Sequence, residues 1–121
     1  MIIALWIATG ALALAFAMAG TMKLITPYAQ VATQARMEWT EEVTPPQLKT
    51  IGALEVVGAV GMILPAATGL FSWLTPTAAF ALALMMGVAV SLHARRRENA
   101  TPSIVLGSLA LLIGIGWTVL P

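Results

Sequence analysis

The chain has 121 residues, of which 60% are hydrophobic and 9% are charged; none is cysteine, and the formal net charge is +1. This composition is typical of membrane proteins rather than soluble globular domains, and the length supports a single domain. A net charge near zero gives no reason to expect nucleic acid as a partner. The lack of cysteine excludes thiol–disulfide chemistry and thiolate metal sites, and with a single histidine we expect no metal centre.

Four apolar segments predict an all-α, four-helix transmembrane bundle. A repeated Thr-Pro pair marks helix starts, because threonine is a good N-cap and proline is favoured in the first turn. About 20 helical residues cover the roughly 30 Å core of a bilayer. The pairs are Thr26-Pro27, Thr44-Pro45, Thr75-Pro76 and Thr101-Pro102, and they predict helices over approximately 2–25, 45–64, 76–95 and 102–120. The pattern Thr44-Pro-Pro-Gln47 also fits a capping box.

The first apolar segment has a signal peptide as its alternative, because Ala17-Met-Ala19 is a small-residue pattern like a cleavage site. Two features argue against that interpretation. No basic region precedes the apolar run, and the run is longer than the roughly 7–15 residues of a signal-peptide core. We therefore interpret the segment as a membrane helix.

The segment 27–39 is predicted to be a short amphipathic helix that lies in the membrane interface between the first two spans. A helix here places Tyr28, Val31, Ala35 and Trp39 near one face. Tyrosine and tryptophan are enriched at the level of the lipid headgroups, which favours an interfacial position. An irregular loop is the alternative.

The positions of lysine and arginine predict how the spans are oriented, because short cytoplasmic loops carry an excess of both. Three arginines occupy 95–97, between the third and fourth spans, and Arg36 and Lys49 lie between the first and second. We therefore predict a multi-pass protein of a bacterial-type inner membrane with loops 27–44 and 96–101 in the cytoplasm. Both termini are predicted to lie outside.

Small residues at helical spacing predict close packing of helices. Ala79, Ala83, Gly87 and Ser91 recur every four positions on the third span, and the second and fourth spans carry glycines. Such faces let helix backbones approach closely where lipid provides no hydrophobic drive between helices. Besides the lipid bilayer, the partners predicted from these Gly/Ala faces are other membrane subunits or a second copy of the chain.

One carboxylate, Glu55, lies in an apolar environment, since no charged residue follows it between positions 56 and 92. Placing a carboxylate at the centre of a membrane helix costs roughly 2.5–3.5 kcal/mol on insertion scales. We therefore expect Glu55 to be paired, protonated or close to the water boundary. The most direct partner is Lys23, near the end of the first span, because the first two spans are antiparallel neighbours.

Lys23, Glu55 and His93 come from three successive spans and fall toward the same side of the bilayer, where the segment with Tyr28 and Trp39 could cover them. These five residues form the predicted ligand-binding cluster, and no catalytic residue is predicted. Each ionisable member has an alternative role. Lys23 can extend toward the headgroups, Glu55 can act as an interhelical clamp, and His93 can be an interfacial residue beside the arginines.

The chain resembles the DoxX-like family of small four-helix membrane proteins over nearly its whole length. The similar pieces are Gly20-Thr-Met-Lys23-Leu24, Ile51-Gly52-Ala-Leu-Glu55 with Gly58 and Pro65, and Met86-Gly87 followed by His93. The resemblance implies a four-helix bundle, and relatives include a small subunit linked to quinone-coupled thiosulfate oxidation. We expect no intrinsic cofactor, and a quinone is the bound molecule that the resemblance implies. Without cysteine, any relation to thiol-oxidising four-helix enzymes is architectural only.

Three functions remain open from the sequence. The first is an accessory subunit or assembly protein that docks to a larger membrane complex and has no enzymatic activity of its own. The second is a redox-associated subunit, a component of a quinone-linked oxidoreductase, in which Lys23, Glu55 and His93 donate to quinone carbonyls. The third is a small lipid or solute carrier, although the interrupted helices typical of transporters are not evident.

Overall fold

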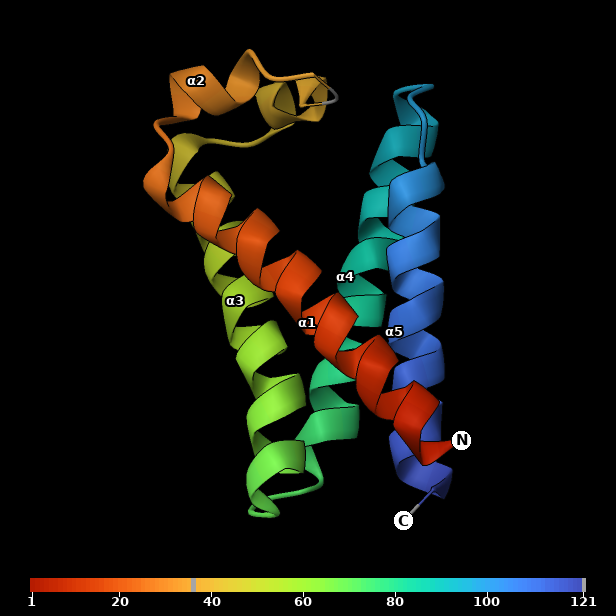
Figure 1. The fold of residues 1–121 in the computed structure, drawn as a ribbon. Helices are drawn as coiled ribbons and strands as arrows, with labels where there is room; N and C mark the ends of the chain where they lie inside the picture. The colour runs from red at the N-terminus through yellow and green to blue at the C-terminus, as the bar shows by residue number, and fades with distance from the viewer. Residues whose placement is uncertain (36, 121) are drawn as a thin grey trace.

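The computed structural model describes residues 1–35 and 37–120, and all regular secondary structure in these residues is helical (Figure 1). Four of the helices are long and apolar enough to cross a membrane. This architecture confirms the predicted all-α bundle of four spans with a short helical segment after the first. The elements are α1 (Ile2–Ile25), α2 (Tyr28–Ala32), the 3₁₀ helix η1 (Glu38–Glu42), α3 (Pro45–Thr68), α4 (Leu74–Arg95) and α5 (Thr101–Val119).

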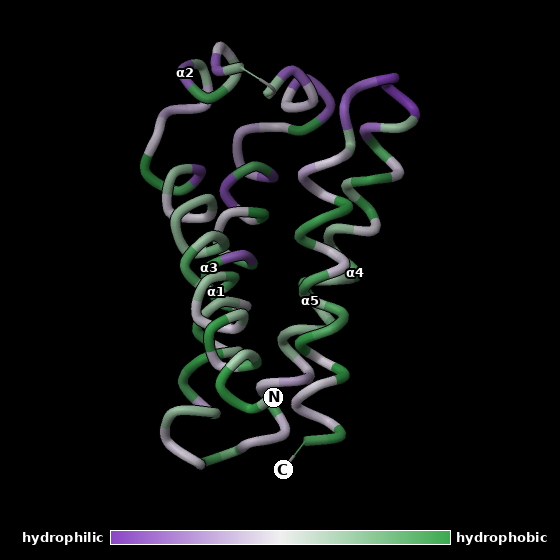
Figure 2. The backbone as a smooth tube through the Cα atoms, turned by 45° about the vertical axis from the view of Figure 1, so that its right-hand side comes forward, coloured by the Kyte–Doolittle hydropathy of each residue, from purple (hydrophilic) through white to green (hydrophobic). Residues whose placement is uncertain are grey.

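The long helices pack as two antiparallel pairs, α1 with α3 and α4 with α5, and the pairs meet through α3 with α4 and α1 with α5. One end of the bundle carries α2, η1 and the α4–α5 turn at residues 96–100, and we call it the polar end. The other, the apolar end, holds the α3–α4 turn and both ends of the chain (Figures 1 and 2). The two loops with charged residues therefore lie together, as predicted; Arg36 lies outside the described residues.

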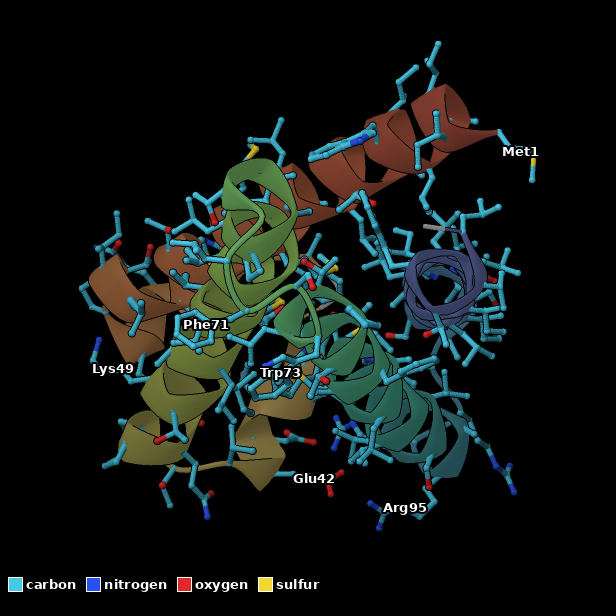
Figure 3. The ribbon with its side chains drawn as sticks, turned by 90° about the horizontal axis from the view of Figure 1, so that it is seen from below. Met1, Glu42, Lys49, Phe71, Trp73 and Arg95 are labelled. Carbon is cyan, nitrogen blue, oxygen red and sulfur yellow. The ribbon has the colours of Figure 1, made fainter. Side chains whose placement is uncertain are left out.

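The four spans consist mostly of hydrophobic residues along their length (Figure 2), and many of these side chains face outward: Leu84 and Leu112, for example, are more than half exposed. A helix that is hydrophobic on all sides is typical of a membrane span. Figure 3 looks along the bundle from the apolar end, where Phe71 and Trp73 project from the α3–α4 turn and are largely exposed. Aromatic residues at this position are typical of the membrane–water interface.

Thr44 is the N-cap of α3 and forms the predicted capping box with Gln47. Its hydroxyl accepts from the Gln47 N–H at 3.3 Å, and its own N–H donates to the Gln47 side chain at 2.9 Å. The other Thr-Pro pairs do not act as N-caps for the long helices: α4 begins at Leu74, before Thr75, and α5 begins at Thr101 itself. Their threonines lie inside the first helical turn.

The hydroxyl of Thr75 binds another helix, which explains why this residue does not act as the predicted N-cap. It is buried and donates to the Met62 carbonyl of α3 at 2.8 Å, which ties the start of α4 to its neighbour. The predicted end of the second span at residue 64 was also too early. α3 continues through Pro65 and ends at Thr68; Gly69, whose left-handed conformation (φ 74°) suits a C-cap, follows it. The proline removes one helical donor but leaves the following turn intact.

The predicted helix over 27–39 is shorter than expected and is divided into α2 and η1. The hydroxyl of Thr33 donates back to the Gln30 carbonyl at 2.8 Å, a local bond that competes with helix continuation. The Tyr28 hydroxyl donates to the carbonyls of Thr40 (2.7 Å) and Val43 (3.1 Å), so α2 and η1 fold against each other. We call the segment that carries these two helices the strap.

Most glycines lie where two helices of the bundle come into close contact. At seven of the ten, an added Cβ would come within 4 Å of another helix; for example, Gly58 lies against Leu82 and Gly114 against Phe80. These contacts surround a buried core that includes Phe16 and Met62. Most of the glycines are therefore used between helices of this chain. Among the glycines on the spans, only Gly10 and Gly87 face open space.

Candidate functional site

Lys23 and Glu55 form an ion pair between α1 and α3, near the polar end. The Lys23 Nζ lies 2.7 Å from the Glu55 Oε1, and the two residues are only 8% and 4% exposed. Lys23 lies in the last turn of α1, and Glu55 lies in the first half of α3. The carboxylate that the sequence places among apolar residues is thus paired.

Two glycines bring these side chains together. An added Cβ on Gly20 would lie 2.5 Å from the Gly52 carbonyl oxygen, and one on Gly52 would lie 2.7 Å from the Gly20 oxygen, so the backbones of α1 and α3 are in contact. The same two positions make room for the ion pair. Gly20 lies against the Glu55 side chain, and Gly52 lies against the Lys23 side chain.

The spacing of three residues explains this reciprocal fit. Residues at i and i+3 share one face of a helix, so Gly20 with Lys23 and Gly52 with Glu55 each face the neighbouring helix. Helical side chains lean toward the N-terminus of their own helix. Because α1 and α3 are antiparallel, Lys23 and Glu55 lean toward each other across the glycine contact. We call Gly20, Lys23, Gly52 and Glu55 the clamp.

A second contact joins the same two helices at the polar end. The Lys49 ammonium of α3 donates to the Leu24 carbonyl of α1 at 2.8 Å. The last carbonyls of a helix lack intrahelical partners and carry its negative dipole end, which a cation stabilises. Each helix of the pair thus contributes one lysine that binds the other.

His93 does not join the clamp. Its Nδ1 lies 2.9 Å from the Glu98 carboxylate, and its ring is perpendicular to that of Trp39, with the ring centroids 6.4 Å apart. Among the described residues, no hydrogen bond or ion pair connects His93 to Lys23 or Glu55. The five predicted residues are therefore divided: Lys23 with Glu55, His93 with Trp39, and Tyr28 inside the strap.

Arg96 is the centre of a second polar site, which joins the strap to the α4–α5 turn. Its guanidinium binds the carboxylates of Glu41 (2.7 Å), Glu42 (2.7 Å) and Glu98 (2.9 Å) and the Glu38 carbonyl (3.1 Å). Five donors in a planar fork allow arginine to bind several acceptors at once. We call Arg96, Glu41, Glu42, Glu98 and His93 the Arg96 network.

Hydrogen bonding in the network shifts two protonation equilibria. The bonds to Glu42, Glu98 and Glu41 raise the pKa of Arg96 above its ordinary value. The bonds from His93 and Arg96 lower the pKa of Glu98 below its ordinary value of 4.5. The network was missed in the sequence, where the arginine run was interpreted as a topology signal and a contact with lipid headgroups. The available sign was the cluster of acids at positions 38–42, on the same side of the bilayer as the arginines.

In both sites the charged side chains are already bound to partners within the protein. In the described part of the chain, every side-chain nitrogen or oxygen that is fully shielded from solvent has a hydrogen-bond partner, and no group of three acidic, histidine or cysteine side chains could hold a metal ion. A groove of about 520 Å³ runs between α4 and α5, and another of about 440 Å³ between α1 and α5. Neither is lined by Lys23, Glu55 or His93.

Comparison with known proteins identifies one family. The chain matches the model of the DoxX-like family over residues 7–117, a range that includes the clamp and the Arg96 network. No curated protein and no solved structure matches the chain.

Proposed function

The chain belongs to the DoxX-like family and is a small multi-pass membrane protein, and from this premise we propose that it is an accessory subunit or assembly protein of a larger membrane complex. The observation that carries this proposal is the pairing of Lys23 with Glu55. Lys23 and Glu55, the buried ionisable residues of the spans, bind each other and hold α1 against α3. They therefore support a rigid scaffold more directly than a reaction centre.

The proposed orientation follows from the charge distribution. All of the lysines and arginines occur between residues 23 and 97, and the described ones lie toward the polar end. The excess of these residues in cytoplasmic loops supports a cytoplasmic polar end, with both termini outside, in a bacterial-type inner membrane. In this orientation the strap and the Arg96 network face the cytoplasm.

Purification from native membranes tests the proposed role. A tagged chain, cross-linked in intact membranes and extracted in mild detergent, is expected to carry a partner at a fixed ratio across several detergents. The matched control is the same chain with Gly20→Leu, which forces α1 and α3 apart and should lose that partner. A chain that is recovered only as a monomer, with no partner at constant stoichiometry, would contradict the proposal.

The quinone alternative gives a different result in the same preparation. A quinone headgroup bound by Lys23 and Glu55 would require their ion pair to open, because both groups are already bonded to each other. If this alternative holds, the purified protein retains quinone and the Glu55→Gln variant retains much less. A clamp predicts that quinone content is the same in both proteins.

A further inference from the structure

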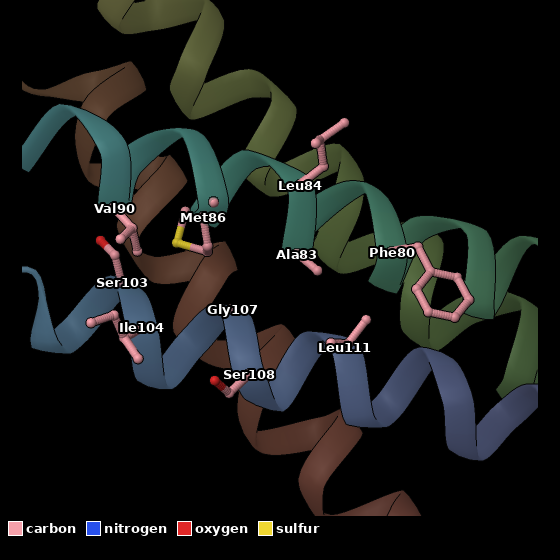
Figure 4. Close-up of a pocket in the computed structure, with 11 residues that line it drawn as sticks. Phe80, Ala83, Leu84, Met86, Val90, Ser103, Ile104, Gly107, Ser108 and Leu111 are labelled. Carbon is pink, nitrogen blue, oxygen red and sulfur yellow. The ribbon is translucent and has the colours of Figure 1, made fainter.

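The groove between α4 and α5 is an apolar channel on the outer face of the bundle (Figure 4). On α5 it extends from Ser103 to Leu111, about 12 Å of helical rise. Its width depends on two residues without side chains, Gly87 on α4 and Gly107 on α5. Gly87 faces open space, because a Cβ added there would meet no atom within 4 Å.

A polar side chain lies at one end of this apolar groove. Ser103 is 9% exposed, and Figure 4 shows its hydroxyl between the two helices beside Val90. Among the described residues, no hydrogen bond of this hydroxyl is found, and the groove is the space into which it opens. The residue is mostly buried, but its hydroxyl is accessible from the groove and is an unused donor and acceptor at the polar end of the channel.

In the first turn of α5, the backbone N–H without a partner among the described residues also belongs to Ser103. Ala100, the N-cap residue, provides no side-chain cap, and Pro102 has no N–H. The Thr101 N–H already donates to the Asn99 side chain at 3.0 Å. The Ser103 N–H is therefore the open donor of the first turn, at the positive end of the helix dipole, where anions bind.

Two arginines add positive charge at this end. Arg95 ends α4, and Arg97 lies in the turn that joins the two walls of the groove; both are exposed. In the part of the chain that the structure describes, neither forms an ion pair, whereas Arg96 between them binds three carboxylates. Glu98, the nearest acid, is bound by Arg96 and His93. The turn at the same end of the bundle as Ser103 therefore carries two positive charges that no acid of the described residues pairs with.

We propose that this groove binds one anionic phospholipid. An acyl chain occupies the channel between α4 and α5, and the phosphate accepts hydrogen bonds from the Ser103 N–H and hydroxyl beside Arg95 and Arg97. Inside a bilayer the acyl chain gains little from leaving other lipid chains, so the phosphate contacts and the arginines provide the selectivity. The inference goes beyond the accessory role and does not depend on it.

Native mass spectrometry of the delipidated protein in detergent tests this site, with phosphatidylglycerol and phosphatidylcholine of the same acyl chains as probes. We expect one phosphatidylglycerol per chain to bind at least ten-fold more tightly than phosphatidylcholine. Ser103→Ala combined with Arg97→Gln should remove most of that preference. Equal affinities for the two lipids, or unsaturable binding of many lipids, would overturn the proposal.

The substitution Gly87→Leu tests the channel itself, because a Cβ at this position meets no atom within 4 Å and the rest of the new side chain occupies space in the groove. It should lower phosphatidylglycerol affinity at least ten-fold. Gly10→Leu, at the other open glycine of the spans, is the matched control and should change the affinity less than two-fold. Unchanged binding in Gly87→Leu would overturn the proposal, as would a change only in oligomeric mass, which would identify the groove as a helix-docking surface.

Inorganic phosphate distinguishes a lipid site from a site for the free anion. It shares the headgroup chemistry but has no acyl chain, so we expect no displacement of bound phosphatidylglycerol at millimolar phosphate. Complete displacement would show that the mouth of the groove binds phosphate alone and would contradict the lipid assignment.

Discussion

The clamp and the Arg96 network are both built from ion pairs at 2.7–2.9 Å, but they differ in burial. The side chains of Lys23 and Glu55 are 9% and 5% exposed, whereas the Glu41 side chain bound to Arg96 is 69% exposed. A buried charge without its partner is costly, while an exposed one returns to water. Contact distance alone therefore does not measure what a pair contributes to the fold.

The largest difference between the two sites should come from removing one charge of the clamp. Glu55→Leu leaves the Lys23 ammonium without its carboxylate, and breaking a buried pair costs about 3–5 kcal/mol. We expect a loss of this size in the free energy of unfolding, measured by reversible denaturation in mixed detergent micelles. Glu41→Leu in the network is the control, with an expected loss below about 1 kcal/mol. Similar losses in the two variants would remove the distinction.

A substitution at the contact between Gly20 and Gly52 should destabilise the clamp without changing any charge. In Gly20→Ala, the new methyl would lie 2.5 Å from the Gly52 carbonyl oxygen, and a backbone atom cannot move aside as a side chain can. Overpacking of this kind typically costs about 1–3 kcal/mol. Gly87→Ala should be neutral or stabilising in the same unfolding measurement, because it meets no atom and alanine favours helix. Equal stability of the two variants would show that α1 and α3 are not in backbone contact.

Removal of the central arginine should affect the strap far more than the bundle. We expect Arg96→Gln to change the free energy of unfolding of the bundle little, because Glu41 and Glu42, which it binds, have exposed side chains that water can solvate. Hydrogen exchange in η1 should nevertheless become faster, because the guanidinium joins this helix to the α4–α5 turn. Arg95→Gln, which removes an exposed arginine without an ion pair among the described residues, should leave η1 exchange unchanged. Unchanged exchange in Arg96→Gln would mean that other contacts hold the strap.

The smallest effect expected is a weakening of the network in acid. The pKa of Glu98 is lowered in the folded protein, so its stabilising contribution is complete above its ordinary value of 4.5 and is lost as the pH falls through the lower folded value. Protection factors in η1 should therefore decrease below about pH 4.5. Glu98→Gln cannot titrate and should show a smaller decrease. An identical acid response in both proteins would assign the effect to other groups.

The spans were predictable because local rules decide them. Apolar length, the Thr44 capping box and a lone carboxylate that needs a partner are all readable from a single sequence. The ends of the helices depended on tertiary contacts that no local pattern contains. Thr75 lies inside α4 rather than before it, because its hydroxyl binds the Met62 carbonyl. α3 continues past Pro65, and Gly69 caps its C-terminal end.

The polar end was only partly predictable for the same reason. Residues 27–39 have the apolar spacing of one amphipathic helix, but the bonds of Tyr28 and Thr33 fold the segment into two short helices. His93 lies at the predicted end of the bundle, yet Glu98, five residues later, is the acid that it binds. Spacing places a residue at a depth in the membrane, whereas its partner depends on how the loops fold.

A double-mutant cycle on Lys23 and Glu55 tests the clamp most directly. The free energy of unfolding is measured for the wild type, Lys23→Met, Glu55→Leu and the double variant in one detergent mixture. We expect the double variant to be more stable than either single variant, because two apolar side chains of similar length replace a buried pair without leaving a charge alone. Losses that add to within about 0.5 kcal/mol would show that the two residues act independently and that no clamp joins α1 to α3.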